Sequence, residues 1–330
     1  MKYSKSLDGL RALFILAVMG IHAGTLSGGF LGVDSFFTLS GYLITFLLLE
    51  EWTKHSKISL RLFYLRRALR LFPALFALVL FWTLFGLLFR SAYDLRIGKE
   101  QIFPALFYYA NYARAFGSDI GILGHTWSLS VEEQFYIAWP PLLLLLLKTG
   151  WSRKRIVILL FIFIVLVNFW RLILFFNGSE LGRIYYAFDT RADALLIGCA
   201  FALFPKMPEF RWASWGLEVI FILWIITSHT LGAFTMLALT ILPVLTVVVI
   251  SQSSHLSFLR SPLLVWLGKL SYSLYLWHYP VFSYLKNLPV HWRFLAALIA
   301  ACVSYYFIEI PFLRLKLRFS SDKVIKVHGS

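Results

Sequence analysis

The sequence predicts an all-α, polytopic membrane protein in which about ten helices cross the bilayer. The chain has 330 residues, of which 60% are hydrophobic and only 14% are charged, whereas a soluble protein has about a quarter charged residues. Apolar runs close to twenty residues long recur along the whole length, which is typical of membrane-spanning helices. The runs are continuous rather than alternating, and this excludes a β-barrel.

The apolar runs divide the chain into ten predicted spans with alternating connections. The spans lie at 10–26, 33–51, 70–89, 129–147, 155–176, 187–205, 212–230, 233–250, 262–284 and 293–313. With this placement, one set of connections carries 21 of the 31 basic residues and the other carries seven. Because lysine and arginine accumulate on the cytoplasmic side of membrane proteins, we expect both termini in the cytoplasm and an even number of spans.

The formal net charge of +15 has the same explanation. A strongly basic chain can bind nucleic acid, but these charges fall where the positive-inside rule predicts them. We therefore expect the lipid bilayer of the cell inner membrane, and no nucleic acid, as the partner of the chain. Residues 1–313 form one integral membrane domain in this prediction, and residues 314–330 form a basic cytoplasmic tail.

Two connections are long enough to hold structure of their own. Residues 52–69 mix basic with large apolar side chains, which predicts an interfacial amphipathic helix running into the third span. Residues 90–128 include the stretch FPALFYYANYARAF, which predicts a helix at the outer interface or dipping into it. Cys199 and Cys302 both fall within spans, which favours small core residues over a disulfide or a metal site.

The first span carries a cation near its start and an imidazole near its end. Arg11 and His22 are eleven residues apart, so on a helix they share one face and are separated by about 16 Å of rise. Ionisable groups within spans are costly, and each is a candidate functional residue. Asp34 begins the second span near the depth of His22. It could orient His22 as a general base or cap its own helix.

The fourth span opens with GHTWSLSVEEQF, which places two acids near the outer side. Glu133 has capping-box spacing from Ser130, whereas capping does not explain Glu132. We expect Glu132, His125 and Trp127 to line an outer site for a carbohydrate, because indole rings offer a stacking surface and carboxylates accept hydrogen bonds from hydroxyls.

Arginines cluster at the cytoplasmic start of the third span. Arg66, Arg67 and Arg70 lie close together in the segment LRRALRLFP, with Arg66 and Arg70 on one face. The positive-inside rule alone can explain them. The alternative is a phosphate clamp, for which the guanidinium group is well suited.

Later spans also carry polar residues. In DTRADALLIG, Asp189 and Asp193 share a face with Arg191 available to neutralise them, and Gly198 suits close helix packing. In LGKLSYSLYLWH, a polar stripe can serve either hydrogen bonding between helices or catalysis; its members are Ser271, Tyr275 and His278. Glu309 is an acid in the last span, beside a proline.

These segments together resemble the acyltransferase family 3 membrane proteins. The matching stretches, in the order of the family, are LDGLRALFILAVMGIHAG, GGFLGVDSFFTLSGYLIT, RRALRLFPAL, HTWSLSVEEQFYIAWP, RADALLIG, LGKLSYSLYLWH and FIEIPF. The family's Arg-x10-His motif falls on Arg11 and His22, and its Arg-x-x-Arg motif on Arg67 and Arg70. The resemblance implies about ten spans and transfer of an acyl group, expected to be acetyl, from cytoplasmic acyl-CoA to a hydroxyl of a carbohydrate or glycolipid outside.

The resemblance also implies roles for the candidate residues. The phosphates of the donor substrate, acetyl-CoA, are expected at the three arginines of the third span, and its pantetheine arm is expected to pass Arg11 toward His22. His22 would act as the general base with support from Asp34, and Glu132 is a further catalytic candidate. No metal is expected. The acceptor would contact the remaining candidates, namely His125, Trp127, Glu133, Arg191, Tyr275 and His278.

Other functions remain open on the sequence. Polar groups at several depths also fit a transporter of an envelope glycan precursor, although no inverted repeat or matched pair of broken helices is evident. A binding component that has lost catalysis is disfavoured by the presence of both Arg11 and His22. A different membrane acyltransferase family with an intramembrane histidine is disfavoured by the order of the motifs.

Overall fold

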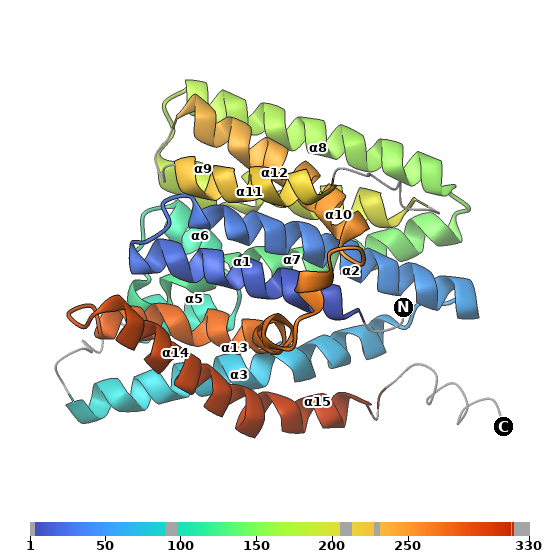
Figure 1. Ribbon diagram of the computed structural model, residues 1–330. Helices are drawn as coiled ribbons and strands as arrows, with labels where there is room; N and C mark the ends of the chain where they lie inside the picture. Colours follow the sequence, from blue (N-terminus) through green and yellow to red (C-terminus); the bar gives the residue numbers. More distant parts are fainter. Residues whose placement is uncertain (1–3, 90–97, 205–212, 228–231, 318, 320–330) are drawn as a thin grey trace.

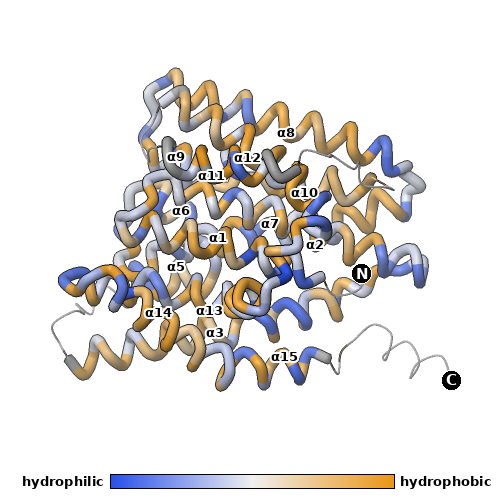
Figure 2. The backbone as a smooth tube through the Cα atoms, in the orientation of Figure 1, coloured by the Kyte–Doolittle hydropathy of each residue, from blue (hydrophilic) through white to orange (hydrophobic). Residues whose placement is uncertain are grey.

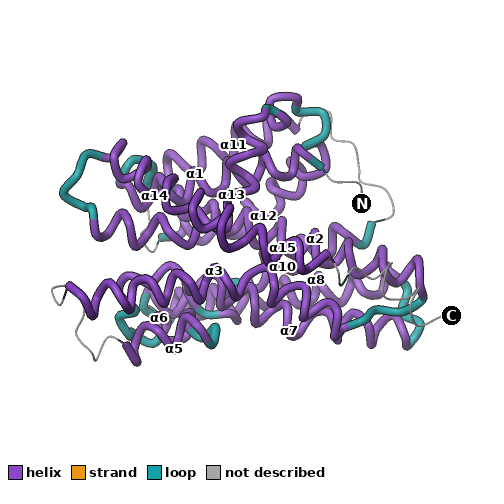
Figure 3. Tube along the Cα trace, turned by 90° about the horizontal axis from the view of Figure 1, so that it is seen from below, coloured by secondary structure: helices purple, strands orange, loops and turns teal. Residues whose placement is uncertain are grey.

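The computed structural model describes residues 4–89, 98–204, 213–227, 232–317 and 319, and these residues form helices and connecting turns. The long helices run lengthwise beside one another, and most loops gather at the two ends (Figure 1, Figure 3). Hydrophobic residues fill most of each long helix, and hydrophilic residues collect mainly near the ends (Figure 2). The predicted all-α fold is therefore confirmed for the described part of the chain.

Six helical stretches of the described chain are long and apolar enough to cross a bilayer. They are α1 (Lys5–Ala23), α2 (Gly32–His55) with the turn before it, α3 (Leu60–Phe89), α8 (Arg153–Phe176), α12 (Ala233–Gln252), and α14 (Val290–Ser304) continuing into α15 (Ile310–Leu317). Two helices of similar length are α7 (Trp127–Lys148) and α13 (Pro262–Tyr284), and two shorter ones are α10 (Ala192–Ala202) and α11 (Ala213–Ile226). The count of ten spans and the sides of the termini stay predictions.

The connection between the second and third spans is shorter than predicted. The chain leaves α2 at Ser56, which adopts a left-handed conformation with φ 49°, and α3 already begins at Leu60. Residues 60–69 are thus the first turns of a 30-residue helix that continues past Pro73. The predicted interfacial helix is therefore not a separate element, because its residues are divided between the end of α2 and the first turns of α3.

The aromatic segment before α7 packs along that helix. It forms α5 (Phe103–Leu106) and α6 (Ala110–Ala115), and residues 90–97 lie outside the described chain. Gln134 donates to the carbonyl of Tyr108 at 2.8 Å and exchanges hydrogen bonds with Asn111. Gln134 lies about 10 Å along α7 from its first residue. Irregular backbone at membrane depth needs such protein partners, so the contacts favour the dipping alternative.

Glycines allow two pairs of helices to pack in close contact. A Cβ added at Gly268 of α13 would lie 1.8 Å from the Asp8 carbonyl oxygen of α1. On the other side of the bundle, a Cβ at Gly198 of α10 would lie 2.0 Å from the Thr38 carbonyl oxygen of α2. The predicted packing role of Gly198 is confirmed. Cys199, beside it, is buried and free, as is the less buried Cys302.

The sixth predicted span, 187–205, is interrupted. The chain forms α9 (Leu181–Tyr186), a 3-10 turn at Phe188–Thr190, and then the 11-residue α10. The carbonyl of Thr190, just before α10, accepts a hydrogen bond from Arg171 of α8 at 3.0 Å. A full-length sixth span was therefore the wrong prediction, because the polar segment DTRAD forms a turn held by neighbouring helices.

Candidate functional site

A cavity of about 230 Å³ lies between α1, α2, α3, α7 and α13. Three arginines and one acid supply its charge, namely Arg11, Arg67, Arg70 and Glu132. Hydroxyls and apolar side chains complete the lining: Ser40, Ser128, Ser271, Tyr136, Tyr272, Tyr275, Val33, Phe36, Phe37, Leu43, Ile44, Leu47, Leu71 and Leu129. The lining residues of α2 extend over about 21 Å of that helix. The cavity is therefore elongated along the bundle and carries net positive charge.

The arginines of α3 do not all face this cavity. Arg67 stacks on the ring of Tyr136, with its guanidinium carbon 3.5 Å from the ring centroid, and approaches Glu133 at 3.4 Å. Arg70 lines the cavity, and within the described residues no hydrogen bond or ion pair holds it. Arg66 instead contacts Glu51 at 3.4 Å and the Phe319 carbonyl at 3.2 Å. The expected three-arginine clamp is corrected: Arg11 replaces Arg66 in the set that faces the cavity.

The two acids of α7 occupy different places from those expected. Glu132 accepts a hydrogen bond from Ser40 at 2.8 Å and faces the cavity, not an outer site shared with Trp127. Glu133 pairs with Arg67. The capping box is not formed, because α7 already begins at Trp127 and Ser130 lies one turn inside the helix. Ser130 instead accepts from the Ala110 amide at 3.2 Å.

A cluster of histidines lies at the end of α1 beyond the cavity. Nδ1 of His22 is 2.9 Å from Nε2 of His278, and Nδ1 of His278 is 2.9 Å from the Leu274 carbonyl oxygen. The ring of His125 lies 5.7 Å from that of His278, and Nε2 of His125 donates to the Leu276 carbonyl at 3.1 Å. His278 and His125 are buried, whereas His22 is partly exposed.

Tyr275 joins the cavity to the histidine cluster. Its ring lines the cavity, and its hydroxyl donates to the backbone carbonyl of His125. Ser128 then donates to the oxygen of Tyr275 at 2.6 Å. His22 is not part of the cavity lining, and Tyr275 lies three residues before His278, about one helical turn along α13. Polar groups thus continue from the arginines in the cavity through Tyr275 to the histidine cluster that contains His22.

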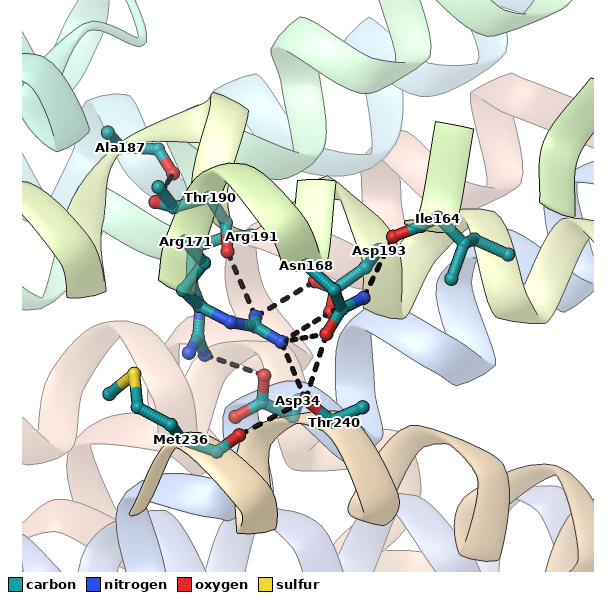
Figure 4. Close-up of polar contacts among 10 residues, drawn as sticks. All are labelled: Asp34, Ile164, Asn168, Arg171, Ala187, Thr190, Arg191, Asp193, Met236 and Thr240. Carbon is teal, nitrogen blue, oxygen red and sulfur yellow. Dashed lines mark hydrogen bonds and ion pairs between the residues drawn. The ribbon is translucent and has the colours of Figure 1, made fainter. Parts of the chain in front are cut away.

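Asp34 is paired with an arginine, which corrects its predicted role. Oδ1 of Asp34 accepts from Arg191 at 2.6 Å (Figure 4), and both side chains are almost completely buried. A buried carboxylate needs a compensating charge, and α10 supplies it. The imidazole that contacts His22 comes from His278, so the expected support of His22 by Asp34 is replaced by a histidine pair.

A second buried ion pair, between Arg171 and Asp193, lies beside the first. Arg171 contacts Asp193 at 2.9 Å, and Asn168 and Thr240 bind the same guanidinium (Figure 4). Asp189 pairs with Arg183 instead. The prediction that Arg191 neutralises both aspartates was wrong, because the turn before α10 separates their side chains.

Trp127 belongs to the same buried region and is not open to an acceptor. Only 5% of its surface is exposed. Its ring packs against Phe37 and Tyr185, and the Arg191 guanidinium lies 4.6 Å above the Tyr185 ring and 5.8 Å from that of Trp127. The predicted stacking surface is already used inside the protein.

Several residues of the site were missed in the sequence. Tyr136 follows Glu132 by four residues, and this helical spacing was a usable signal for its place on the cavity face. Ser128, four residues before Glu132, and Tyr272, three residues before Tyr275, carried the same signal, whereas Ser40 carried none. Glu309, which had no predicted partner, ends a π-helical turn at Tyr305–Glu309 and accepts a hydrogen bond from Ser273 of α13.

Comparison with known proteins agrees with the motif order. The family model described as an acyltransferase domain matches residues 4–310. The chain belongs to acyltransferase family 3. The family resemblance is thereby confirmed, and the match does not favour the transporter alternative.

Relatives in this family include named enzymes. Peptidoglycan O-acetyltransferase OatA of Listeria monocytogenes is 35% identical over an alignment of 348 positions, gaps included, and the alignment covers 94% of this chain and 56% of the relative. O-acetyltransferase OatA of Staphylococcus aureus is 34% identical, with 94% of this chain and 57% of the relative covered. This chain therefore spans somewhat more than half the length of these family members. No solved structure matches it significantly.

Proposed function

We propose that this protein moves an acetyl group from cytoplasmic acetyl-CoA to a hydroxyl of a cell-envelope carbohydrate at the outer face of the inner membrane, with His22 as the general base. The observation that carries the proposal is the arrangement along α1. Arg11 faces a basic cavity, and His22 contacts a histidine cluster about 16 Å farther along the same helix.

The basic end of the cavity suits the phosphates of the donor. Arg67 and Arg70 lie one helical turn apart on α3, and Arg11, which also contacts Asp8 at 2.9 Å, lines the same cavity. Arg70 has no protein anion within hydrogen-bonding distance among the described residues. A guanidinium without a protein partner is available for bidentate binding of phosphate. The long cavity then leads the acyl end of the donor toward Tyr275 and the histidines.

The transfer step needs a base at the acceptor hydroxyl. His22 removes the hydroxyl proton while the oxygen attacks the thioester carbonyl carbon, so that a C–O bond forms and the C–S bond breaks. The coenzyme A thiolate leaves and takes the proton from the His22 imidazolium. The products are an acetyl ester and free coenzyme A, and His22 is regenerated.

The first acceptor to test is peptidoglycan, because one relative is named a peptidoglycan O-acetyltransferase. In the assay, acetyl-CoA labelled in the acetyl group is added to membranes that contain the protein. The ester-linked label is then measured in peptidoglycan and in the other envelope glycans. Wild-type protein is expected to transfer label, and His22→Gln to lose at least about a hundredfold in rate.

The matched control is His291→Gln, since His291 is exposed and lies neither in the histidine cluster nor in the cavity lining. It should transfer label at the wild-type rate. Transfer by His22→Gln at the rate of this control would remove His22 from the chemistry. If neither the wild-type protein nor the control variant consumed acetyl-CoA in the presence of any of the glycans, acetyl-CoA would not be the donor.

A further inference from the structure

We infer that His278 is a positioning residue that fixes His22 in the tautomer whose Nε2 atom accepts the proton. The inference rests on the proposed role of His22 as the base. In this arrangement a second imidazole takes the place of the carboxylate that is usually paired with a catalytic histidine. The second imidazole is anchored on a backbone carbonyl of α13.

The tautomers follow from the hydrogen-bond partners. A carbonyl oxygen can only accept, so Nδ1 of His278 must carry the hydrogen that it donates to Leu274, 2.9 Å away. In a neutral imidazole the other nitrogen is then an acceptor. Nδ1 of His22, which lies 2.9 Å from Nε2 of His278, must therefore be the donor. This leaves the lone pair of His22 on Nε2.

The surroundings of His278 fit a neutral ring. Its side chain is 0% exposed, and its hydrogen bonds within the described chain go to Leu274 and His22, neither of which is an anion. A buried charge without a compensating partner costs several kcal/mol. Asp34, the nearest acid expected from the sequence, is engaged by Arg191.

The same contact stabilises the charged state that forms during transfer. When Nε2 of His22 takes a proton, Nδ1 of the imidazolium still donates to Nε2 of His278, and the bond becomes charge-assisted. Nδ1 of His278 keeps its own hydrogen and donates it to the Leu274 carbonyl throughout. The ring of Tyr279 lies edge-on to that of His22 at 4.8 Å and 74°, which further limits rotation of the base.

Two variants of His278 separate positioning from packing. His278→Leu fills similar space but cannot accept the hydrogen bond, whereas His278→Gln keeps an acceptor and a donor. We expect His278→Leu to lower kcat about a hundredfold with the KM for acetyl-CoA unchanged, and His278→Gln to recover at least about tenfold of that loss. Equal loss in both variants, or a rise in KM that accounts for the loss, would contradict positioning.

The second measurement reads the tautomer directly in the full-length protein. Nitrogen-15 NMR of histidine-labelled wild-type protein in lipid distinguishes protonated from unprotonated ring nitrogens, and His22→Gln identifies the signals of His22. We expect a hydrogen on Nδ1 and none on Nε2. A hydrogen on Nε2 would overturn the inference.

The two measurements also separate this inference from the proposed function. Undiminished transfer by His22→Gln refutes the base itself, whatever the tautomer. Wild-type kcat in His278→Leu refutes only the positioning role and leaves His22 as the base.

Discussion

The Arg191 guanidinium and the Asp34 carboxylate join α10 to α2 at 2.6 Å, with side-chain exposures of 0% and 3%. Around them, Arg191 also lies above Tyr185, and Oδ2 of Asp34 has no hydrogen-bond partner among the described residues. An ion pair this deeply buried acts mainly on folding, because each charge is tolerated only while the other is present.

Removing one member of this pair should destabilise the protein strongly. We expect Asp34→Leu or Arg191→Met alone to cost about 3–5 kcal/mol, because the remaining charge stays buried and unpaired. The double variant Asp34→Leu/Arg191→Met should recover most of that loss. Thermal unfolding in detergent, followed by fluorescence, measures all three proteins. If the double variant folds but transfers no acetyl group, Asp34 or Arg191 has a role in the reaction.

Arg70 should contribute to donor binding more than its neighbours on α3. Arg70→Gln removes a cation that faces the cavity, and we expect the KM for acetyl-CoA to rise about tenfold or more, the value of one or two charge-assisted hydrogen bonds. The matched control is Arg61→Gln, an exposed position on the same helix, which should keep the wild-type KM. A similar rise in both variants would indicate a general surface potential and not a phosphate site.

The contact of α10 with α2 should not tolerate a methyl group. Gly198→Ala places a Cβ 2.0 Å from the Thr38 carbonyl oxygen, so the helices must separate, and we expect a loss of about 1–3 kcal/mol in stability. Gly232→Ala is the control, because a Cβ there meets nothing within 4 Å. Comparable melting temperatures for both variants would show that the two helices are less tightly packed.

Gln134 should hold the segment of α5 and α6 against α7. Gln134→Leu keeps the volume but leaves the Tyr108 carbonyl and the Asn111 amide without this partner, at about 1–3 kcal/mol for each buried group. We expect faster hydrogen exchange in peptides from 103–116, measured by mass spectrometry. Exchange in α8 of the same sample is the internal reference, and acceleration there to the same degree would mean global unfolding instead.

The sequence predicted the long helices well because each carries a continuous apolar run. The break before α10 was missed for the same reason: LLIGCAFAL extends the apolar run of that region, while the turn depends on contacts from Arg171 and Asp34. Hydropathy contains no information about partners from other helices. Arg11 and Glu132 were singled out because charges within spans are costly, and Arg67 and Arg70 because clustered guanidinium groups suit phosphate; all four line the cavity.

Pairings between distant residues were the part that sequence reasoning could not supply. Asp34 and His22 are close in sequence and in predicted depth, and this suggested a pair. The depth of a residue in the membrane, however, does not determine toward which neighbouring helix its side chain points. His22 contacts α13, whereas Asp34 contacts α10. The partners of both residues lie more than 150 positions away, and only the packing of the helices selects them.

The short α10 constrains how the protein enters the membrane. Its 11 residues cover about 16 Å, half of a hydrocarbon core of about 30 Å, and Arg191 and Asp193 stand at its start. Each charge alone would oppose insertion by about 2.5–3.5 kcal/mol at the bilayer centre. Their partners Asp34 and Arg171 precede them in the chain, and synthesis proceeds from the N-terminus. Asp34 and Arg171 are therefore synthesised before α10, so that both of its charges can be paired as it inserts. The order of synthesis thus lowers a cost of insertion that the hydropathy of α10 does not offset.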